Sequence, residues 1–283
     1  MGSPAKLRKS CQRAGGEYLL STAINPLSTV LPFHSVDIYR TSTYFGNGPI
    51  LTNYSSNSQS TITSKGRRMS KLQDLQRVFD HPIVAVIRAP DGSLLIDVAE
   101  ALLAGGVEVL EVTFTVPKAH RVLEQVADKL GDKVLLGAGT VLDPETARTA
   151  LLAGAKFVVS PTVNVDVIKL CQRYDAAVMP GAFTPTEIVT AWEAGADIVK
   201  IFPSDFVGPA YLKAIHGPLP QIRLMPTGGV NLTTAVEFLK AGAVALGVGG
   251  SLVEPKAVAN RDFQRIQSLA AQYVEIVRKF RAG

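Results

Sequence analysis

Residues 197–205, D-I-V-K-I-F-P-S-D, have the pattern of a short buried strand with a lysine inside it. Valine, isoleucine and phenylalanine favour an extended backbone, and Pro203 ends the run. Because side chains alternate along a strand, Lys200 shares one face with Ile198 and Phe202. Both faces are apolar, as expected for a strand that is covered on both sides.

A buried amine at Lys200 is open to two interpretations. Desolvation disfavours the ammonium form and lowers its pKa, and the neutral amine is a nucleophile toward carbonyl groups. Alternatively, the side chain reaches the rim of the sheet or pairs with a carboxylate and has a structural role only. The residues at the other strand ends are needed to choose between covalent catalysis and a structural pair.

Seven further segments have a similar apolar, β-branched pattern, and helix-like segments separate them. Eight strand–helix repeats after residue 69 predict an α/β protein with a closed (β/α)₈ TIM barrel, and an open doubly wound sheet is the alternative. The predicted strands are 83–89, 107–114, 134–141, 157–162, 177–183, 198–204, 222–229 and 243–250.

The helices between these strands have recognisable starts and ends. Asp143 before Pro144, and Thr184 with Glu187 three residues later, predict two N-caps. The segment 259–281 predicts a long final helix, and 70–80 is a second candidate helix that could close the bottom of the barrel. Ala-Gly pairs predict helix ends with a left-handed glycine at 104–105, 153–154, 194–195 and 241–242.

Residues 1–68 differ in composition from the rest of the chain. They hold eight Lys/Arg, two acids and 18 Ser/Thr without a sustained period, which predicts an extension with little fixed structure. Three interpretations compete: a transit peptide, a signal-like apolar stretch at 18–36, and a start codon assigned upstream of Met69. We favour the third, with residues 69–283 as a single domain.

The net charge of +5 comes from this extension, so it does not indicate a nucleic-acid partner. Two cysteines, Cys11 and Cys171, suit a reducing compartment, and no apolar run is long enough to predict a membrane span. These features predict a cytoplasmic protein without a nucleic-acid or membrane partner.

In a TIM barrel, the functional residues gather at the carboxyl ends of the strands. Glu111 lies there in an apolar run, where it either shuttles protons or pairs with Lys200 or Arg88. Glycine pairs follow the seventh and eighth strands and make either a phosphate site or tight turns. None of the four histidines falls at a predicted strand end beside another metal ligand, which favours amine catalysis over a metal site.

Together these motifs resemble the 2-keto-3-deoxy-6-phosphogluconate (KDPG)/4-hydroxy-2-oxoglutarate (KHG) aldolases, which are class I pyruvate aldolases. The resemblance covers 75–280 and none of 1–68. It rests on E-V-T-F-T-V-P (111–117), G-A-G-T-V (137–141), S-P (160–161), M-P-G (179–181), V-K-I-F-P (199–203), P-T-G-G-V (226–230) and G-V-G-G-S (247–251).

The resemblance implies that Lys200 forms a Schiff base with a 2-keto acid and that Glu111 shuttles protons. It implies no metal and no cofactor, and a homotrimer. The substrate-binding residues that it implies are Arg88, Thr113, Thr140, Pro161 and Phe202, and the phosphate-binding residues are Thr227, Gly228, Gly229, Gly249, Gly250 and Ser251.

One position departs from part of the family. Some members have arginine where this chain has Thr115, so the grip on the pyruvate carboxylate falls on Arg88 and on hydroxyl groups. The alternatives are a 2-keto-3-deoxy-6-phosphogalactonate aldolase, another phosphate-binding TIM-barrel isomerase or epimerase, and a non-catalytic relative that binds a keto acid or serves as an assembly partner.

Overall fold

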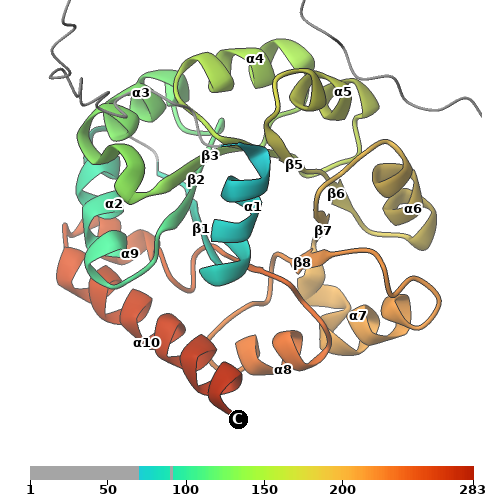
Figure 1. Cartoon of the computed structure of the whole chain (residues 1–283). Coiled ribbons are helices and arrows are strands. Elements are labelled where there is room, and N and C mark those ends of the chain that lie inside the picture. The colour runs from blue at the N-terminus through green and yellow to red at the C-terminus, as the bar shows by residue number, and fades with distance from the viewer. Residues whose placement is uncertain (1–69, 90–91) are drawn as a thin grey trace, which may run out of the picture. The chain divides into compact units, whose positions relative to one another are not determined.

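The computed structural model describes residues 70–89 and 92–283, so the predictions for 1–68 lie outside the described residues. In the described part, strands and helices alternate, and the helices surround the strands (Figure 1). The strands are β1 Ile83–Ile87, β2 Val109–Thr113, β3 Leu135–Gly139, β4 Phe157–Val159, β5 Ala177–Met179, β6 Gly181–Ala182, β7 Val199–Ile201, β8 Leu224–Pro226 and β9 Leu246–Val248. The helices are α1 Lys71–Asp80, α2 Leu95–Ala104, α3 Ala119–Leu130, α4 Pro144–Leu152, α5 Val165–Arg173, α6 Pro185–Glu193, α7 Gly208–His216, α8 Ala235–Lys240, α9 Pro255–Ala259 and α10 Phe263–Ala282.

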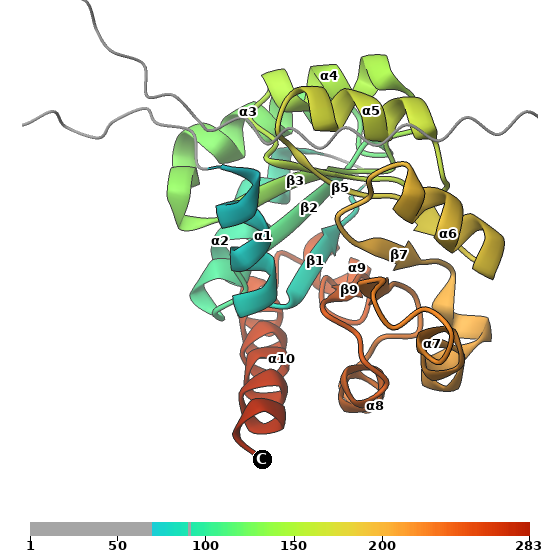
Figure 2. The same ribbon diagram turned by 45° about the vertical axis from the view of Figure 1, so that its right-hand side comes forward.

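The strands form two parallel sheets. The larger has the order β5-β4-β3-β2-β1-β9, and the smaller has the order β6-β7-β8. A parallel bridge joins Thr227, the residue after β8, to Gly247 in the middle of β9. Helices between parallel strands place the protein in the predicted α/β class, and Figure 2 shows how the strands curl inside the helices.

Each of the eight predicted strands contains an observed strand. The fifth, 177–183, is divided into β5 and β6 at Pro180. Proline has no backbone N–H to donate to a neighbouring strand, which explains the interruption. The Pro180 carbonyl still accepts a hydrogen bond from the Lys200 N–H at 2.9 Å.

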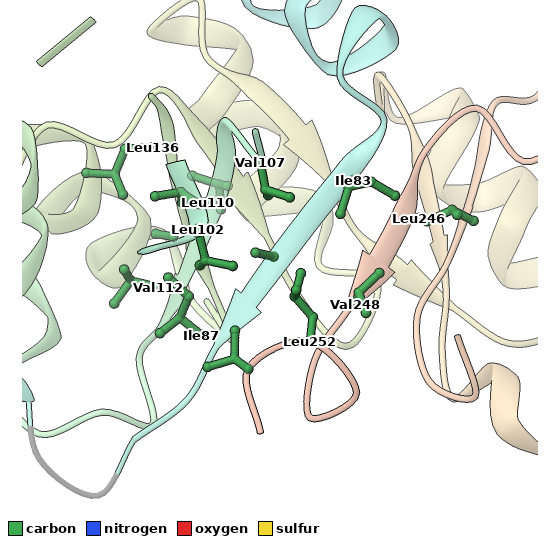
Figure 3. Close-up of a cluster of buried hydrophobic side chains, with 14 of the residues drawn as sticks. Ile83, Ile87, Leu102, Val107, Leu110, Val112, Leu136, Leu246, Val248 and Leu252 are labelled. Atoms are coloured by element: carbon green, nitrogen blue, oxygen red, sulfur yellow. The ribbon is translucent and has the colours of Figure 1, made fainter. Parts of the chain in front are cut away.

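Alternate residues of the strands belong to two separate apolar layers. In β7, Val199 and Ile201 pack in the outer layer against the helices, whereas Ile198, directly before β7, belongs to the inner layer. Lys200 therefore faces inward, as the strand period predicts. Figure 3 shows part of the outer layer around β1, β2 and β9, where Ile83, Ile87, Leu110, Val112, Leu246 and Val248 are labelled.

The inner layer is closed at one end by α1. It contains Val109, Leu135 and Phe157, each the first residue of its strand. Leu75 and Val78 of α1 belong to the same cluster, so the predicted helix at 70–80 is confirmed and covers the amino ends of the strands. In Figure 1, α1 lies across the centre of the ring of helices. The predicted site residues lie at the opposite, carboxyl ends.

Both predicted N-caps are confirmed. The Asp143 side chain accepts a hydrogen bond from the Thr146 N–H at 2.6 Å. Thr184 and Glu187 form a capping box, in which each side chain accepts from the backbone of the other residue.

Two predicted helix boundaries are wrong. The first Ala-Gly pair does not supply the left-handed residue, because Gly105 has a φ of −84° and the next residue, Gly106, has a φ of +88°. The final helix begins at Phe263 rather than at 259. Residue 259 is instead the last residue of α9, and Arg261 then takes a left-handed φ of 55°. Asp262 caps α10, because its side chain accepts a hydrogen bond from the Arg265 N–H. The predicted start at 259 therefore falls at the end of α9, before the turn at Arg261.

No helix among residues 70–89 and 92–283 combines the length and the apolar character that a membrane span requires.

Candidate active site

Lys200 and Glu111 point into the inner layer from β7 and β2. In β2, Val109 belongs to the inner layer and Leu110 to the outer one, which places Glu111 inside. Their exposed fractions are 3% for Lys200 and 1% for Glu111. Each charge shifts the pKa of the other group, so the two side chains lie within electrostatic range, as the sequence predicts.

Burial controls the protonation of Glu111. It raises the pKa of the carboxyl above the ordinary value, and the positive charges of Lys200 and Arg88 only oppose that rise. Within the described part of the chain, neither carboxylate oxygen has a hydrogen-bond partner. A buried acid with a raised pKa and unpaired oxygens has the properties needed to take up and release protons.

Burial also favours the neutral form of Lys200. It lowers the pKa of the amine, the Glu111 carboxylate opposes this shift, and the Arg88 charge adds to it. The Lys200 Nζ lies 5.0 Å from the centre of the Phe202 ring. Among the described residues, no ion pair within 4.0 Å includes Lys200. The amine is therefore available to a carbonyl carbon that reaches it.

Thr113 joins the end of β2 to the end of β1. Its Oγ1 donates to the Ile87 carbonyl at 3.2 Å and lies 2.8 Å from the Thr115 Oγ1. Since the single proton of Thr113 is used on the carbonyl, Thr115 is the donor of the second bond. The Thr113 hydroxyl thus fixes the peptide unit directly before Arg88, and Thr115 has no spare proton in this arrangement.

The end of β3 fits closely around Glu111. Gly139 pairs with Thr113 in the register, and a Cβ at Gly139 would overlap the Glu111 carboxylate. Thr140 follows with a φ of 56°, a left-handed conformation that is costly for a β-branched residue. Pro161 follows β4, and its backbone lies against β6.

A cavity of 440 Å³ opens at the carboxyl ends of β1, β7, β8 and β9. Its lining does not include Lys200, Glu111, Thr113, Thr140 or Pro161. Phe202 does line it, and the centre of the same ring lies 5.0 Å from the Lys200 Nζ. The lining brings together eight of the predicted residues, namely Arg88, Phe202, Thr227, Gly228, Gly229, Gly249, Gly250 and Ser251.

The sequence predictions missed two residues beside this cavity. Asp205 lines it, and its carboxylate occupies the space that a Cβ at Gly228 would need. Ser204 is buried behind the same loop and donates its hydroxyl proton to the Gly228 carbonyl at 2.6 Å. Their place directly after K-I-F-P was the available signal, because the loops that follow parallel strands of an α/β protein lie at the edge where ligands bind.

The family model of the KDPG and KHG aldolases matches residues 75–269. The chain belongs to the KDPG and KHG aldolase family. A 2-dehydro-3-deoxy-phosphogluconate aldolase of Treponema pallidum is 38% identical over 205 residues, which make up 72% of this chain and 95% of the relative. A 2-dehydro-3-deoxy-6-phosphogalactonate aldolase of Escherichia coli is 34% identical and covers 69% of this chain and 96% of its own length.

A solved structure of the same family agrees with the fold. It is the KDPG aldolase of Legionella pneumophila, with pyruvate captured at low pH as a covalent carbinolamine intermediate. It has a TM-score of 0.65 and 33% identity to this chain, and covers 69% of this chain and 95% of its own.

In this member of the KDPG and KHG aldolase family, we expect Gly139→Ala to displace Glu111. The added methyl group overlaps the carboxylate, and a shift of about 1 Å in a catalytic group costs on the order of 10²-fold in rate. Steady-state kcat of purified protein measures the loss. Gly217→Ala is the control, because Gly217 has a φ of −53° and its Cβ would meet no atom closer than 3.4 Å. Unchanged kcat in Gly139→Ala would contradict the proton-shuttle role that the family resemblance implies for Glu111.

Proposed function

We propose that the chain is a class I aldolase that releases pyruvate from a 2-keto-4-hydroxy acid. The substrates are 2-keto-3-deoxy-6-phosphogluconate, which gives glyceraldehyde 3-phosphate, and 4-hydroxy-2-oxoglutarate, which gives glyoxylate. The observation that carries the proposal is a buried lysine of lowered pKa, Lys200, within electrostatic range of a buried glutamate without hydrogen bonds, Glu111. The names of two relatives, a 2-dehydro-3-deoxy-phosphogluconate aldolase and a KHG/KDPG aldolase, agree with this chemistry.

The reaction starts when the neutral Lys200 amine adds to the C2 ketone and forms a carbinolamine. Loss of the C2 oxygen as water gives a protonated imine. Glu111 then removes the proton of the C4 hydroxyl, the C3–C4 bond breaks, and its electron pair moves into the imine. An aldehyde leaves, and the remaining enamine takes a proton at C3. Water hydrolyses the resulting imine to pyruvate and frees Lys200.

The other predicted residues hold the two ends of the substrate. Arg88, at the rim of the cavity, carries the charge that binds the pyruvate carboxylate. Thr140 contributes a hydroxyl, Thr113 holds the strand end before Arg88, and Pro161 and Phe202 enclose the keto acid. The phosphate lies against the loops after β8 and β9, at Thr227, Gly228, Gly229, Gly249, Gly250 and Ser251.

A second candidate substrate is 2-keto-3-deoxy-6-phosphogalactonate, which differs from the gluconate compound at C4. The Escherichia coli relative of that name supports it. A lactate dehydrogenase-coupled assay of pyruvate release, run with all three acids, distinguishes the substrates by their kcat/KM. The proposal requires turnover of at least one of them. Folded protein that is inert toward all three would favour an isomerase or a non-catalytic relative.

We further propose that the two sheets form one closed (β/α)₈ barrel, in which β5 and β6 act as a single strand interrupted at Pro180. The bridge between Thr227 and Gly247 supports closure on the other side. Residues 69–283 then form one catalytic domain. The cysteine content supports a cytoplasmic location, and the family resemblance implies a homotrimer. Analytical ultracentrifugation tests the trimer, which predicts a mass three times that of the chain.

A further inference from the structure

Ser204 holds two successive carbonyl groups of the loop after β8. It is 1% exposed and begins a short 3₁₀ helix, Ser204–Phe206. Its backbone N–H donates to the Thr227 carbonyl at 3.0 Å. Its side-chain hydroxyl donates to the next carbonyl, that of Gly228, at 2.6 Å.

These two bonds fix the direction of the N–H groups that follow. The peptide bonds after Thr227 and Gly228 are trans, so each carbonyl and the next N–H point in opposite directions across a rigid plane. Because both carbonyls point toward Ser204, the N–H groups of Gly228 and Gly229 point away from it. The φ values of these glycines are +97° and +68°, which residues with a side chain rarely adopt.

The two N–H groups are available to a ligand. Gly228 and Gly229 line the 440 Å³ cavity, whereas Ser204 does not. Within the described residues, neither N–H donates to a protein acceptor. Successive backbone N–H groups on one side of a turn form a concave site for an anion. Ser204 therefore supports this site from the side that faces away from the cavity.

A second serine fixes the far end of the loop. The Ser251 hydroxyl donates to the Val230 carbonyl at 2.9 Å. The glycine loop is thus attached on one side to the segment after β7 and on the other to the segment after β9. Among residues 70–89 and 92–283, the charged side chains that line the cavity are those of Arg88 and Asp205. Since the Asp205 carboxylate lies against Gly228, attraction of an anion at this end depends on the backbone N–H groups.

We infer that Ser204 is a positioning residue for the phosphate group of the substrate. Its hydroxyl holds the Gly228 carbonyl back, and this aims the Gly229 N–H at the phosphate. The inference rests on the proposed function and goes one step further, because Ser204 does not touch the substrate and yet sets the affinity for its phosphorylated end.

The test compares wild-type protein with Ser204→Ala, using inorganic phosphate as the probe in isothermal titration calorimetry. Loss of one hydrogen bond that orients the loop is expected to weaken phosphate binding about fivefold. KM for the phosphorylated substrate should rise by a similar factor while kcat stays within about twofold. Ser204→Cys, which keeps a weak donor at the same place, should recover part of the affinity.

A phosphate-free reaction separates this effect from general damage. Pyruvate carries no phosphate, and borohydride reduces the imine that it forms with Lys200 to a stable label. This labelling should proceed at the wild-type rate in Ser204→Ala. Thr190→Ala is the control for losing a hydroxyl–carbonyl bond, because Thr190 donates to the Thr186 carbonyl in α6, outside the cavity lining. It should leave phosphate binding unchanged.

Two results would overturn the inference. One is phosphate affinity in Ser204→Ala equal to that of wild type. The other is an equal loss in phosphate binding and in pyruvate labelling, which would make Ser204 a general structural residue. If wild-type protein itself fails to react with pyruvate, the proposed function fails, and the phosphate titration still reports on Ser204 alone.

Discussion

Replacement of Lys200 with methionine should lower kcat on the order of 10⁵-fold, the size of effect seen when a covalent nucleophile is removed. Methionine has a similar length and an apolar end, so it fills the same buried space without the cost of a desolvated amine. We therefore expect the variant to fold with a melting temperature equal to or above that of wild type. The coupled assay of pyruvate release measures kcat.

The matched control is Lys213→Met, because Lys213 is an exposed lysine of α7. It should keep wild-type kcat. Turnover close to wild type in a folded Lys200→Met protein would show that the amine has only a structural role. That is the alternative interpretation of a lysine inside an apolar strand.

The pH dependence of wild-type protein follows from the same burial. The amine reacts when neutral, and its neutral fraction rises with pH and levels off above its pKa. Because burial lowers the pKa of Lys200 from the ordinary value of 10.5, the rate of pyruvate labelling should level off below pH 10.5. A labelling rate that still rises tenfold per pH unit near pH 10 would contradict the lowered pKa.

Glu111→Gln should lower kcat by about 10²- to 10⁴-fold, which is the usual contribution of a general acid or base. Glutamine keeps the shape of the side chain and removes its ability to carry the C4 hydroxyl proton. Pyruvate should still label Lys200. Single-turnover cleavage of the substrate measures the loss separately from product release.

The same variant has a second readout. The Glu111 carboxylate raises the pKa of Lys200, so its removal should move the pH of half-maximal labelling to a lower value. Glu124→Gln, at an exposed position of α3, should change neither quantity. If Glu111→Gln kept wild-type kcat, another group would have to carry the proton. An unmoved labelling pH would contradict the electrostatic coupling of the two side chains.

The spacing of apolar residues and the N-cap motifs predicted most of the fold, because both depend on contacts between residues that are close in the chain. The alternation around Lys200 gave the inward direction of its side chain, and the caps at Asp143 and Thr184 lie within four residues of the groups that they bind. The start of the final helix was wrong because the predicted segment 259–281 includes a turn that local apolar spacing does not signal. The turn at Arg261 depends on a left-handed backbone at a residue that rarely adopts it.

The residues that sequence patterns missed act between loops that are distant in the chain. Ser204 bonds to Gly228 across 24 positions, and no local spacing signals that contact. The P-T-G-G-V motif (226–230) predicted a glycine pair at the end of the seventh predicted strand. It did not show which residue binds the carbonyl groups of this loop. The sequence showed that Thr115 stands where some relatives have arginine. It did not show that the Thr115 hydroxyl binds that of Thr113.

The central claim is that the buried amine of Lys200 forms a covalent bond with pyruvate. The most direct measurement is intact-protein and peptide mass spectrometry after incubation with pyruvate and sodium borohydride. The account predicts one reduced pyruvyl group for each chain, confined to the peptide that contains Lys200. Folded protein without an adduct, or with the adduct on another lysine, would contradict it.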